Sequence, residues 1–200
     1  MNSIFGSLFI VSTPLGNLKD ITLRALNIMK NSYLIAAEDT RKSQILLKEY
    51  NIKTKMISYH EHNSHKRIKT IISYLKDGKN ISLISDAGTP GISDPSYRLI
   101  RSAIENEITV NSIPGPSAFL TALTSSGLPT DNFFFAGFLP SKKGRKSKLE
   151  ELSKLNSTLI LYENPKRLLK TLNDIYSTCL LYTSDAADEG LGVDLGGRRI

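Results

Sequence analysis

The chain has 200 residues, of which 40% are hydrophobic and 22% are charged. This composition is typical of a folded globular protein and excludes a chain that is disordered throughout. The formal net charge of +7 favours a polyanionic partner such as a nucleic acid, although many basic proteins bind none.

Neither a membrane span nor a targeting segment is indicated. No stretch approaches the roughly 18 consecutive apolar residues that a membrane helix needs. The opening residues, MNSIFGSLFIVSTP, lack the basic start and the cleavage site of a secretory signal. The single cysteine, Cys179, has no CxxC motif and no Cys/His companions, so neither a disulfide framework nor a zinc site is indicated. We therefore expect a cytoplasmic protein with no membrane partner.

Short apolar runs alternate with helical patterns over the first 113 residues. The apolar runs predict strands at residues 8–13, 33–37, 55–59, 81–85 and 108–113. Helices are predicted between them, and the residues that would begin these helices are Asp20, Asp39, Ser64 and the pair Asp94-Pro95. Five strands with intervening helices predict an α/β fold, with a parallel sheet flanked by helices on both faces.

Pro114, Gly115 and Pro116 interrupt this alternation, and a domain boundary is predicted there. Further helices and strands are predicted at residues 117–126, 133–138, 149–155, 158–162 and 165–176. They amount to about half of a second α/β domain. We therefore expect an N-terminal α/β domain at residues 1–114 and a partial, truncated C-terminal α/β domain at residues 115–178.

The last stretch, CLLYTSDAADEGLGVDLGGRRI, differs from the rest of the chain. Residues 179–200 hold four of the 13 glycines and show no apolar period of 2 or 3.6. The string resembles a translated sequencing adapter, so we expect a non-native tail. A natural flexible tail is the alternative.

The loops that follow the five predicted strands are the places to look for a ligand site, because ligands bind beyond the carboxyl ends of parallel strands. These loops read STPLGN, AAEDTRKS, SYHEHNS, SDAGTPGISDP and IPGPSA. A dinucleotide site is not indicated, because the first turn has one glycine where GxGxxG needs three, and no GxxxxGK[ST] occurs.

The loop SDAGTPGISDP is the strongest candidate. Gly88 and Gly91 allow backbone to approach a ligand closely, and two prolines hold the path rigid. Asp86 can accept hydrogen bonds from a hydroxyl or an amine, which favours contact with a ligand. Asp94, just before Pro95, is expected to cap backbone instead.

Five motifs, taken together, resemble one family. TPLGNLKDIT, AAEDTR, SDAGTPGISDP, PGPSA and GFLP occur in this order between about residue 8 and residue 176. The sequence is therefore similar to the ribosomal RNA small subunit methyltransferase I group of the tetrapyrrole methylase superfamily. The resemblance implies the two-domain, class III methyltransferase fold, S-adenosyl-L-methionine as the cofactor, and a homodimer when full length. It implies methylation of the 2′-hydroxyl of a cytidine ribose in small-subunit (16S) ribosomal RNA, with the RNA or the 30S subunit as partner.

The resemblance assigns the cofactor to three turns at one edge of the sheet, beside a cleft between the domains. The residues that match are Pro14, Leu15 and Gly16, then Asp86, Ala87, Gly88 and Thr89, and finally Ser117 and Ala118. Two departures from the family pattern stand out. Ser96 replaces an expected glycine, and we expect little consequence. We also expect the second domain to lack its latter part, which leaves an inactive chain as an alternative.

Removal of the hydroxyl proton requires a base, and Glu38, Asp39, Arg41 and His60 are candidate bases or ligands for ribose and phosphate. The match to AAEDTR favours a functional role for Glu38 and Arg41, whereas Asp39 is equally suited to capping a helix. His60 and His62 flank Glu61 without an evident third ligand, so no metal is expected.

The segment SKKGRKSK, residues 141–148, packs five positive charges into eight residues. A solvated surface is the usual explanation, and a role in binding RNA phosphates is the competitor, which predicts binding that weakens steeply with salt. Two alternatives to the main function remain open. One is a methyltransferase of a porphyrin-like small molecule, and the other is an inactive RNA-binding fragment.

Overall fold

The computed structural model describes residues 5–179 of the chain. The chain divides into two compact units, Met1–Ala122 and Leu123–Ile200. The division falls within a helix, later in the chain than the sequence-based boundary after residue 114, which stays a prediction. Of the tail predicted to be non-native, all but Cys179 lies outside the described residues.

The first unit contains the predicted five-stranded parallel sheet, with strand order β3-β2-β4-β1-β5. The strands are β1 (Leu8–Val11), β2 (Leu34–Ala37), β3 (Met56–Ser58), β4 (Ile81–Ile84) and β5 (Val110–Ile113). Leu8 in β1 lies opposite Ile81 in β4 and Val110 in β5, which sets the register at the centre of the sheet. Each strand is shorter than predicted, so residues expected at the strand ends are in the loops.

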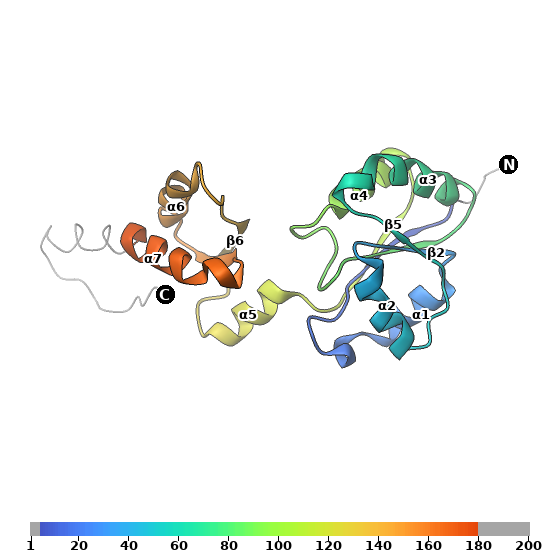
Figure 1. The fold of residues 1–200 in the computed structure, drawn as a ribbon, viewed down its shortest axis with the longest axis horizontal. Coiled ribbons are helices and arrows are strands. Elements are labelled where there is room, and N and C mark those ends of the chain that lie inside the picture. The colour runs from blue at the N-terminus through green and yellow to red at the C-terminus, as the bar shows by residue number, and fades with distance from the viewer. Residues whose placement is uncertain (1–4, 180–200) are drawn as a thin grey trace, which may run out of the picture. The chain divides into compact units, whose positions relative to one another are not determined.

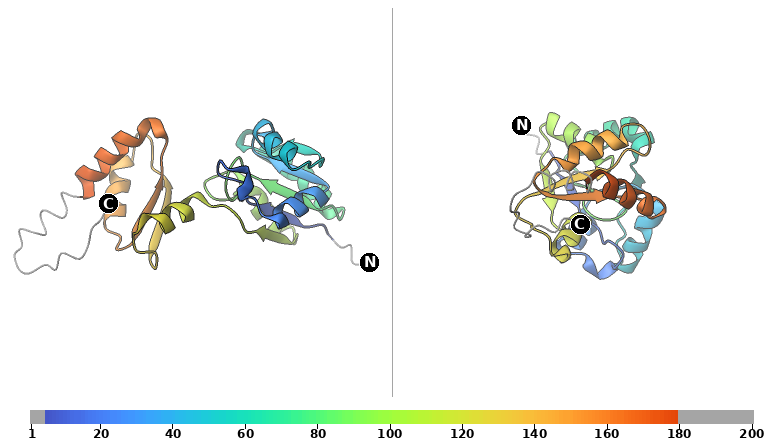
Figure 2. Two further views of the ribbon diagram at one scale, coloured as in Figure 1. Left: turned by 90° about the horizontal axis from the view of Figure 1, so that it is seen from below. Right: turned by 90° about the vertical axis from the view of Figure 1, so that its left-hand side faces the viewer.

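Helices cover both faces of this sheet, as predicted. One face packs against α1 (Leu23–Asn31) and α2 (Thr40–Glu49), and the other against α3 (Ser64–Lys76) and α4 (Ser96–Glu105). Figure 1 shows the two pairs of helices on opposite sides of the strands, and Figure 2 gives two further views. Alternate strand residues enter the two cores, because successive side chains point to opposite faces.

Helix α1 begins two residues later than the sequence predicts. Asp20 was the expected cap, but it lies in the short 3₁₀ helix Leu18–Asp20. Thr22 is extended and its hydroxyl accepts a hydrogen bond from the backbone N–H of Ala25 at 3.1 Å, which makes Thr22 the cap. The prediction for the next helix is confirmed, because Asp39 caps α2 by accepting from the backbone N–H of Arg41.

The second unit is small. Helix α5 (Ala118–Ser126) spans the division between the units, and two parallel strands, β6 (Phe133–Phe138) and β7 (Thr158–Tyr162), pair in the second unit. The unit also contains helices α6 (Arg145–Ser153) and α7 (Leu168–Cys179), and a short 3₁₀ helix at Pro165–Arg167 precedes α7. Among the described residues, the core cluster of this unit consists of Leu139, Leu149 and Leu152.

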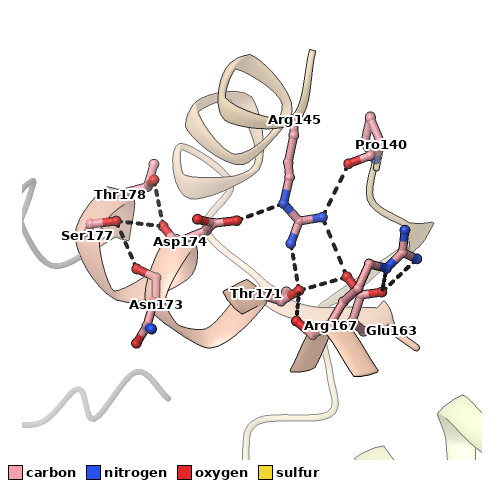
Figure 3. A network of polar contacts seen from close by, with 9 residues as sticks. All are labelled: Pro140, Arg145, Glu163, Arg167, Thr171, Asn173, Asp174, Ser177 and Thr178. Carbon is pink, nitrogen blue, oxygen red and sulfur yellow. Dashed lines mark hydrogen bonds and ion pairs between the residues drawn. The ribbon is translucent and has the colours of Figure 1, made fainter. Parts of the chain in front are cut away.

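The basic segment 141–148 is not a uniform charged surface. The guanidinium of Arg145 is buried, contrary to both explanations offered for the segment, and donates to the carboxylate of Asp174 at 2.8 Å and the hydroxyl of Thr171 at 2.6 Å. Its third acceptor is Pro140 O at 3.2 Å, and Glu163 lies 3.5 Å away as an ion pair (Figure 3). Arg145 therefore holds the second unit together and is not free to bind a phosphate.

Within residues 5–179, no helix combines the length and the apolar character needed to cross a membrane.

Candidate functional site

The loops predicted to bind ligands leave the carboxyl edge of the sheet in the order of the strands. β4, β1 and β5 are neighbours, and the three predicted cofactor turns follow these strands. β3 and β2 are followed by His60 and Glu38. The chain leaves β2 for α2 on one face and β4 for α4 on the other, so the β2–β4 junction is a topological switch point, where ligands bind in open parallel sheets.

The turns after β1 and β4 are joined through their backbones. Thr13 and Gly88 form an isolated antiparallel bridge, with each N–H donating to the carbonyl of the other at 2.9 Å. The hydroxyl of Thr13 also donates to Ser85 O at 3.1 Å. Gly88 has a φ of +82°, and an added Cβ would lie 3.3 Å from Leu15, so glycine suits this crossing. The first two predicted cofactor turns therefore lie side by side.

The turn after β5 joins the same cluster through hydroxyl groups. Ser12 Oγ lies 2.9 Å from Thr89 Oγ1, and Thr89 Oγ1 donates to Pro116 O at 3.1 Å. Gly115 packs so closely against Ser12 that an added Cβ would lie 2.8 Å from the Ser12 Cβ. Ser117 and Ala118 follow directly. The structure thus brings all three predicted cofactor turns together, while their role in binding stays a prediction.

Asp86 connects the loops after β4 and β2. Its Oδ1 accepts from the backbone N–H of Asp39 at 2.9 Å, and its Oδ2 accepts from Lys42 Nζ at 2.6 Å. The sequence favoured a ligand contact for Asp86, and that role stays a prediction. In this structure both oxygens of its carboxylate fix the two loops to each other.

Glu38 lies half-buried at the carboxyl end of β2. Burial raises the pKa of its carboxyl group above the ordinary value of 4.5, and the nearby carboxylates of Asp86 and Asp94 raise this pKa further. A hydrogen bond from the backbone N–H of Asp86 and the charge of Lys42 act in the opposite direction. A carboxyl group with a raised pKa at such a junction is suited to accepting a proton.

Asp39 and Arg41 form a close ion pair instead. Arg41 Nη2 lies 2.8 Å from Asp39 Oδ2, and Arg41 Nε donates to Asp39 Oδ1 at 3.1 Å. These hydrogen bonds hold the pKa of Asp39 well below its usual range. Asp39 is therefore a poor proton acceptor, and its roles in the structure are to cap α2 and to orient Arg41, whose side chain is exposed.

Asn63 contacts both the backbone and the ring of His60. Asn63 Oδ1 accepts from the backbone N–H of His60 at 3.0 Å, so the amide nitrogen Nδ2 is the atom that lies 3.1 Å from His60 Nε2. Asn63 Nδ2 also donates to Ser58 O and Ser58 Oγ at 3.2 Å, so its two protons are shared among three acceptors. His60 Nδ1 is buried and has no hydrogen-bond partner among the described residues. The role of His60 as a base or a ligand stays a prediction.

Three residues of this site were not singled out from the sequence. They are Ser12, Lys42 and Asn63. Ser12 ends the first apolar run and Lys42 follows AAEDTR, but their partners lie 77 and 44 residues away. Among the described residues, no group of three or more His, Cys, Asp or Glu side chains is placed to hold a metal ion.

Comparison with known proteins decides the family. The family model described as "Tetrapyrrole (Corrin/Porphyrin) Methylases" matches residues 7–186. The chain belongs to the tetrapyrrole methylase family. Solved structures agree with this fold. Cobalt precorrin-4 methyltransferase superposes with a TM-score of 0.66 at 14% identity, over 86% of this chain and 74% of that chain. Uroporphyrin-III C-methyltransferase from Thermus thermophilus gives a TM-score of 0.60 at 15% identity, over 86% of this chain and 77% of that chain.

Relatives of much higher sequence identity carry the name "Ribosomal RNA small subunit methyltransferase I". The protein from Thermotoga maritima is 49% identical over 170 residues, covering 85% of this chain and 77% of its own length. The protein from Halalkalibacterium halodurans is 52% identical over 171 residues, covering 85% of this chain and 59% of its own length. The chain thus spans about 60% of the length of some of these relatives. These matches confirm the family resemblance inferred from the five motifs.

Proposed function

We propose that the protein transfers a methyl group from S-adenosyl-L-methionine to the 2′-hydroxyl of a cytidine ribose in small-subunit ribosomal RNA. The relatives named for small-subunit ribosomal RNA support this substrate at about half identity. The observation that carries the proposal is that the three turns contact one another, through the Thr13–Gly88 bridge and through hydrogen bonds that link Ser12, Thr89 and Pro116. The carboxyl group of Glu38, which has a raised pKa, lies at the same edge of the sheet.

The residues of the three turns fit S-adenosyl-L-methionine. Gly16 has a φ of +133° with no atom within 4 Å of an added Cβ, and Leu15 and Ala87 are exposed. These positions offer free space, backbone hydrogen-bonding groups and apolar side chains, which a nucleoside with a charged tail requires. Pro14 to Gly16, Asp86 to Thr89, and Ser117 with Ala118 would hold the cofactor.

Glu38 supplies the base in this proposal. When bound, S-adenosyl-L-methionine supplies an electrophilic methyl group on a sulfonium. Glu38 accepts the proton of the ribose hydroxyl as that oxygen is alkylated, and Lys42 and the Asp86 N–H stabilise its carboxylate before the proton arrives. The rest of the site chiefly positions the reactants, which is the main requirement of an in-line displacement.

Calorimetric titration with S-adenosyl-L-methionine tests the cofactor part of the proposal. Gly88→Ala strains a backbone at φ +82° and crowds Leu15, so it should weaken binding by about tenfold or more, or about 1.4 kcal/mol. Gly127→Ala is the matched control, because Gly127 also has a positive φ, +72°, with no atom within 4 Å of an added Cβ and a position in the second unit. No heat of binding for the wild-type chain would overturn the proposed function.

Methyl transfer to 30S subunits or free small-subunit RNA, taken from cells that lack this methylation, tests the substrate. The proposal expects label from the cofactor on a cytidine ribose, detected as a nucleotide linkage resistant to alkaline hydrolysis. Label on a base, or on a porphyrin-like compound in preference to RNA, would contradict it. The homodimer implied by the family stays a prediction, which sedimentation velocity can test.

A further inference from the structure

A concave surface lies outside the three turns. It is an open pocket of about 710 Å³ between α2 and the edge strand β3. Its lining residues are Thr40, Arg41, Gln44, Leu47, Ile52, Lys53, Thr54, Lys55 and Met56. No residue of the predicted cofactor turns belongs to it, so its role is separate from cofactor binding.

The lining of this pocket carries positive charge without a carboxylate. Arg41, Lys53 and Lys55 are exposed cations, and none of the lining residues is Asp or Glu. Among the described residues, no ion pair involves Lys53 or Lys55. Two cations that share a concavity without internal counterions favour an anionic ligand.

Arg41 lies toward the carboxyl edge of the sheet, where Glu38 is, whereas Lys53 and Lys55 precede β3 at the amino edge. Its Nε and Nη2 donate to Asp39, which fixes the direction of the guanidinium and leaves Nη1 without a contact to Asp39. Arg41 stands three residues after Glu38, on the first turn of α2. Asp39 offsets part of the charge of Arg41, so the two lysines supply most of the pocket's attraction for an anion.

We propose that this pocket binds backbone phosphate of the RNA strand that presents its ribose to Glu38. The inference rests on the proposed function and adds where the substrate strand runs. Lysine ammonium groups bind phosphate as point charges, and Thr40, Gln44 and Arg41 offer further donors among the lining residues. Such contacts position a strand without reading its sequence.

The test compares two double variants that remove the same charge. Lys53→Gln/Lys55→Gln empties the pocket of its lysines, whereas Lys66→Gln/Lys69→Gln removes two exposed lysines of α3, on the opposite face of the sheet. Fluorescence anisotropy measures the binding of a labelled single-stranded RNA with the decoding-region sequence over a series of salt concentrations. Circular dichroism melting checks that both variants fold as the wild type does.

The pocket variant should bind the RNA about tenfold more weakly at low salt, and its slope of log K against log salt should fall by about 1.4, from two lost contacts at about 0.7 each. The control variant should keep a slope close to that of the wild type. Equal effects of the two variants, or wild-type binding that does not respond to salt, would overturn the inference. Preference for a polyglutamate competitor over RNA would also overturn it.

Calorimetry with S-adenosyl-L-methionine on the same samples separates this inference from the proposed function. The pocket variant should retain the wild-type affinity for the cofactor, because none of the lining residues lies in the three turns. Absence of cofactor binding by the wild type would refute the proposed function. An unchanged slope of log K for RNA against log salt in the pocket variant would refute the phosphate site alone.

Discussion

Glu38 and Asp39 are adjacent carboxylates whose ionisation is shifted in opposite directions. Glu38 is half-buried near two other carboxylates, which raises its pKa, whereas Asp39 accepts hydrogen bonds from Arg41, which lowers its pKa. Of these two consecutive residues, Glu38 is suited to accept a proton, whereas Asp39 is suited to cap a helix and to bind a guanidinium. The division of roles follows from the surroundings, because both residues belong to the same motif, AAEDTR.

The proposed base predicts a large effect of Glu38→Gln. The rate of methyl transfer should fall by about 10²- to 10⁴-fold, with the affinity for S-adenosyl-L-methionine unchanged. In the wild type, the rate should decline as pH falls through the pKa of Glu38, which lies above 4.5, because the protonated carboxyl cannot accept a proton. Initial rates across this pH range measure both effects. Glu49→Gln, at the exposed end of α2, is the control, and a Glu38→Gln variant with the wild-type rate would exclude Glu38 as the base.

The lowered pKa of Glu163 predicts how the stability of the protein depends on pH. Hydrogen bonds from the Thr171 hydroxyl and the Asn164 backbone, together with Arg167, lower its pKa from 4.5 to about 2. A lowered carboxyl pKa gives stability that is complete above pH 4.5 and is lost as pH falls toward about 2. Glu163→Gln should therefore be less stable at neutral pH and lose less stability in acid. Urea unfolding at several pH values measures this, with Glu105→Gln as control, and parallel acid profiles for wild type and Glu163→Gln would contradict it.

The positions of residues in the fold were predictable from the sequence where a motif is local, whereas their roles stay predictions. Pro14, Gly88 and Ser117 could be placed near strand ends because each lies within four residues of the end of a predicted strand. The loop-joining contacts of Asp86 and the burial of Arg145 were not predictable, because their partners lie 44 to 47 and up to 29 residues away. A basic run such as residues 141–148 carries no signal that one of its members turns inward.

At the scale of elements, apolar periodicity in the sequence predicted every strand of the five-stranded sheet and the helices that pack on it. The ends were less certain, because hydrogen bonding rather than hydrophobicity sets them. Residues such as Ser12, Thr13 and Ser85 continue an apolar run in sequence but leave the strand to bond across the carboxyl edge. Strand ends that depart from the periodic pattern therefore coincide with the candidate site.

The correction at the start of α1 yields a paired prediction. Thr22→Ala removes the hydroxyl that accepts from Ala25 N–H and should lower the free energy of unfolding by about 1 kcal/mol. Asp20→Ala should change it by less than about 0.5 kcal/mol, because Asp20 is exposed and does not cap α1. Denaturant unfolding of both variants gives the comparison. A larger loss for Asp20→Ala than for Thr22→Ala would restore the sequence-based assignment.

At the scale of the whole molecule, the apolar cores of the two units share no residue. Among residues 5–179, the first unit contains clusters of 13 and 10 buried residues on the two faces of its sheet, all before residue 114. The second unit contains a cluster of three. The two-domain organisation inferred from Pro114-Gly115-Pro116, which breaks the strand-helix alternation, stays a prediction. The sequence did not indicate the division within α5, because a helical pattern looks the same on either side of it.

The unequal cores predict unequal stability of the two units. A fragment of residues 1–126, which ends with α5, should fold and unfold cooperatively, because every residue of the two large clusters is retained. A fragment of residues 123–179 should lack a cooperative transition, because a core cluster of three leucines and a two-stranded sheet bury too little apolar surface to offset chain entropy. Urea unfolding, monitored by circular dichroism, measures the cooperativity of both fragments.

Amide hydrogen exchange is the second measurement. The longer fragment should reproduce the exchange protection that β1, β2 and β4 have in the whole chain. If those strands lose protection when residues 127–200 are removed, the sheet depends on contacts beyond its own two cores, and the independence argued from the clusters is wrong.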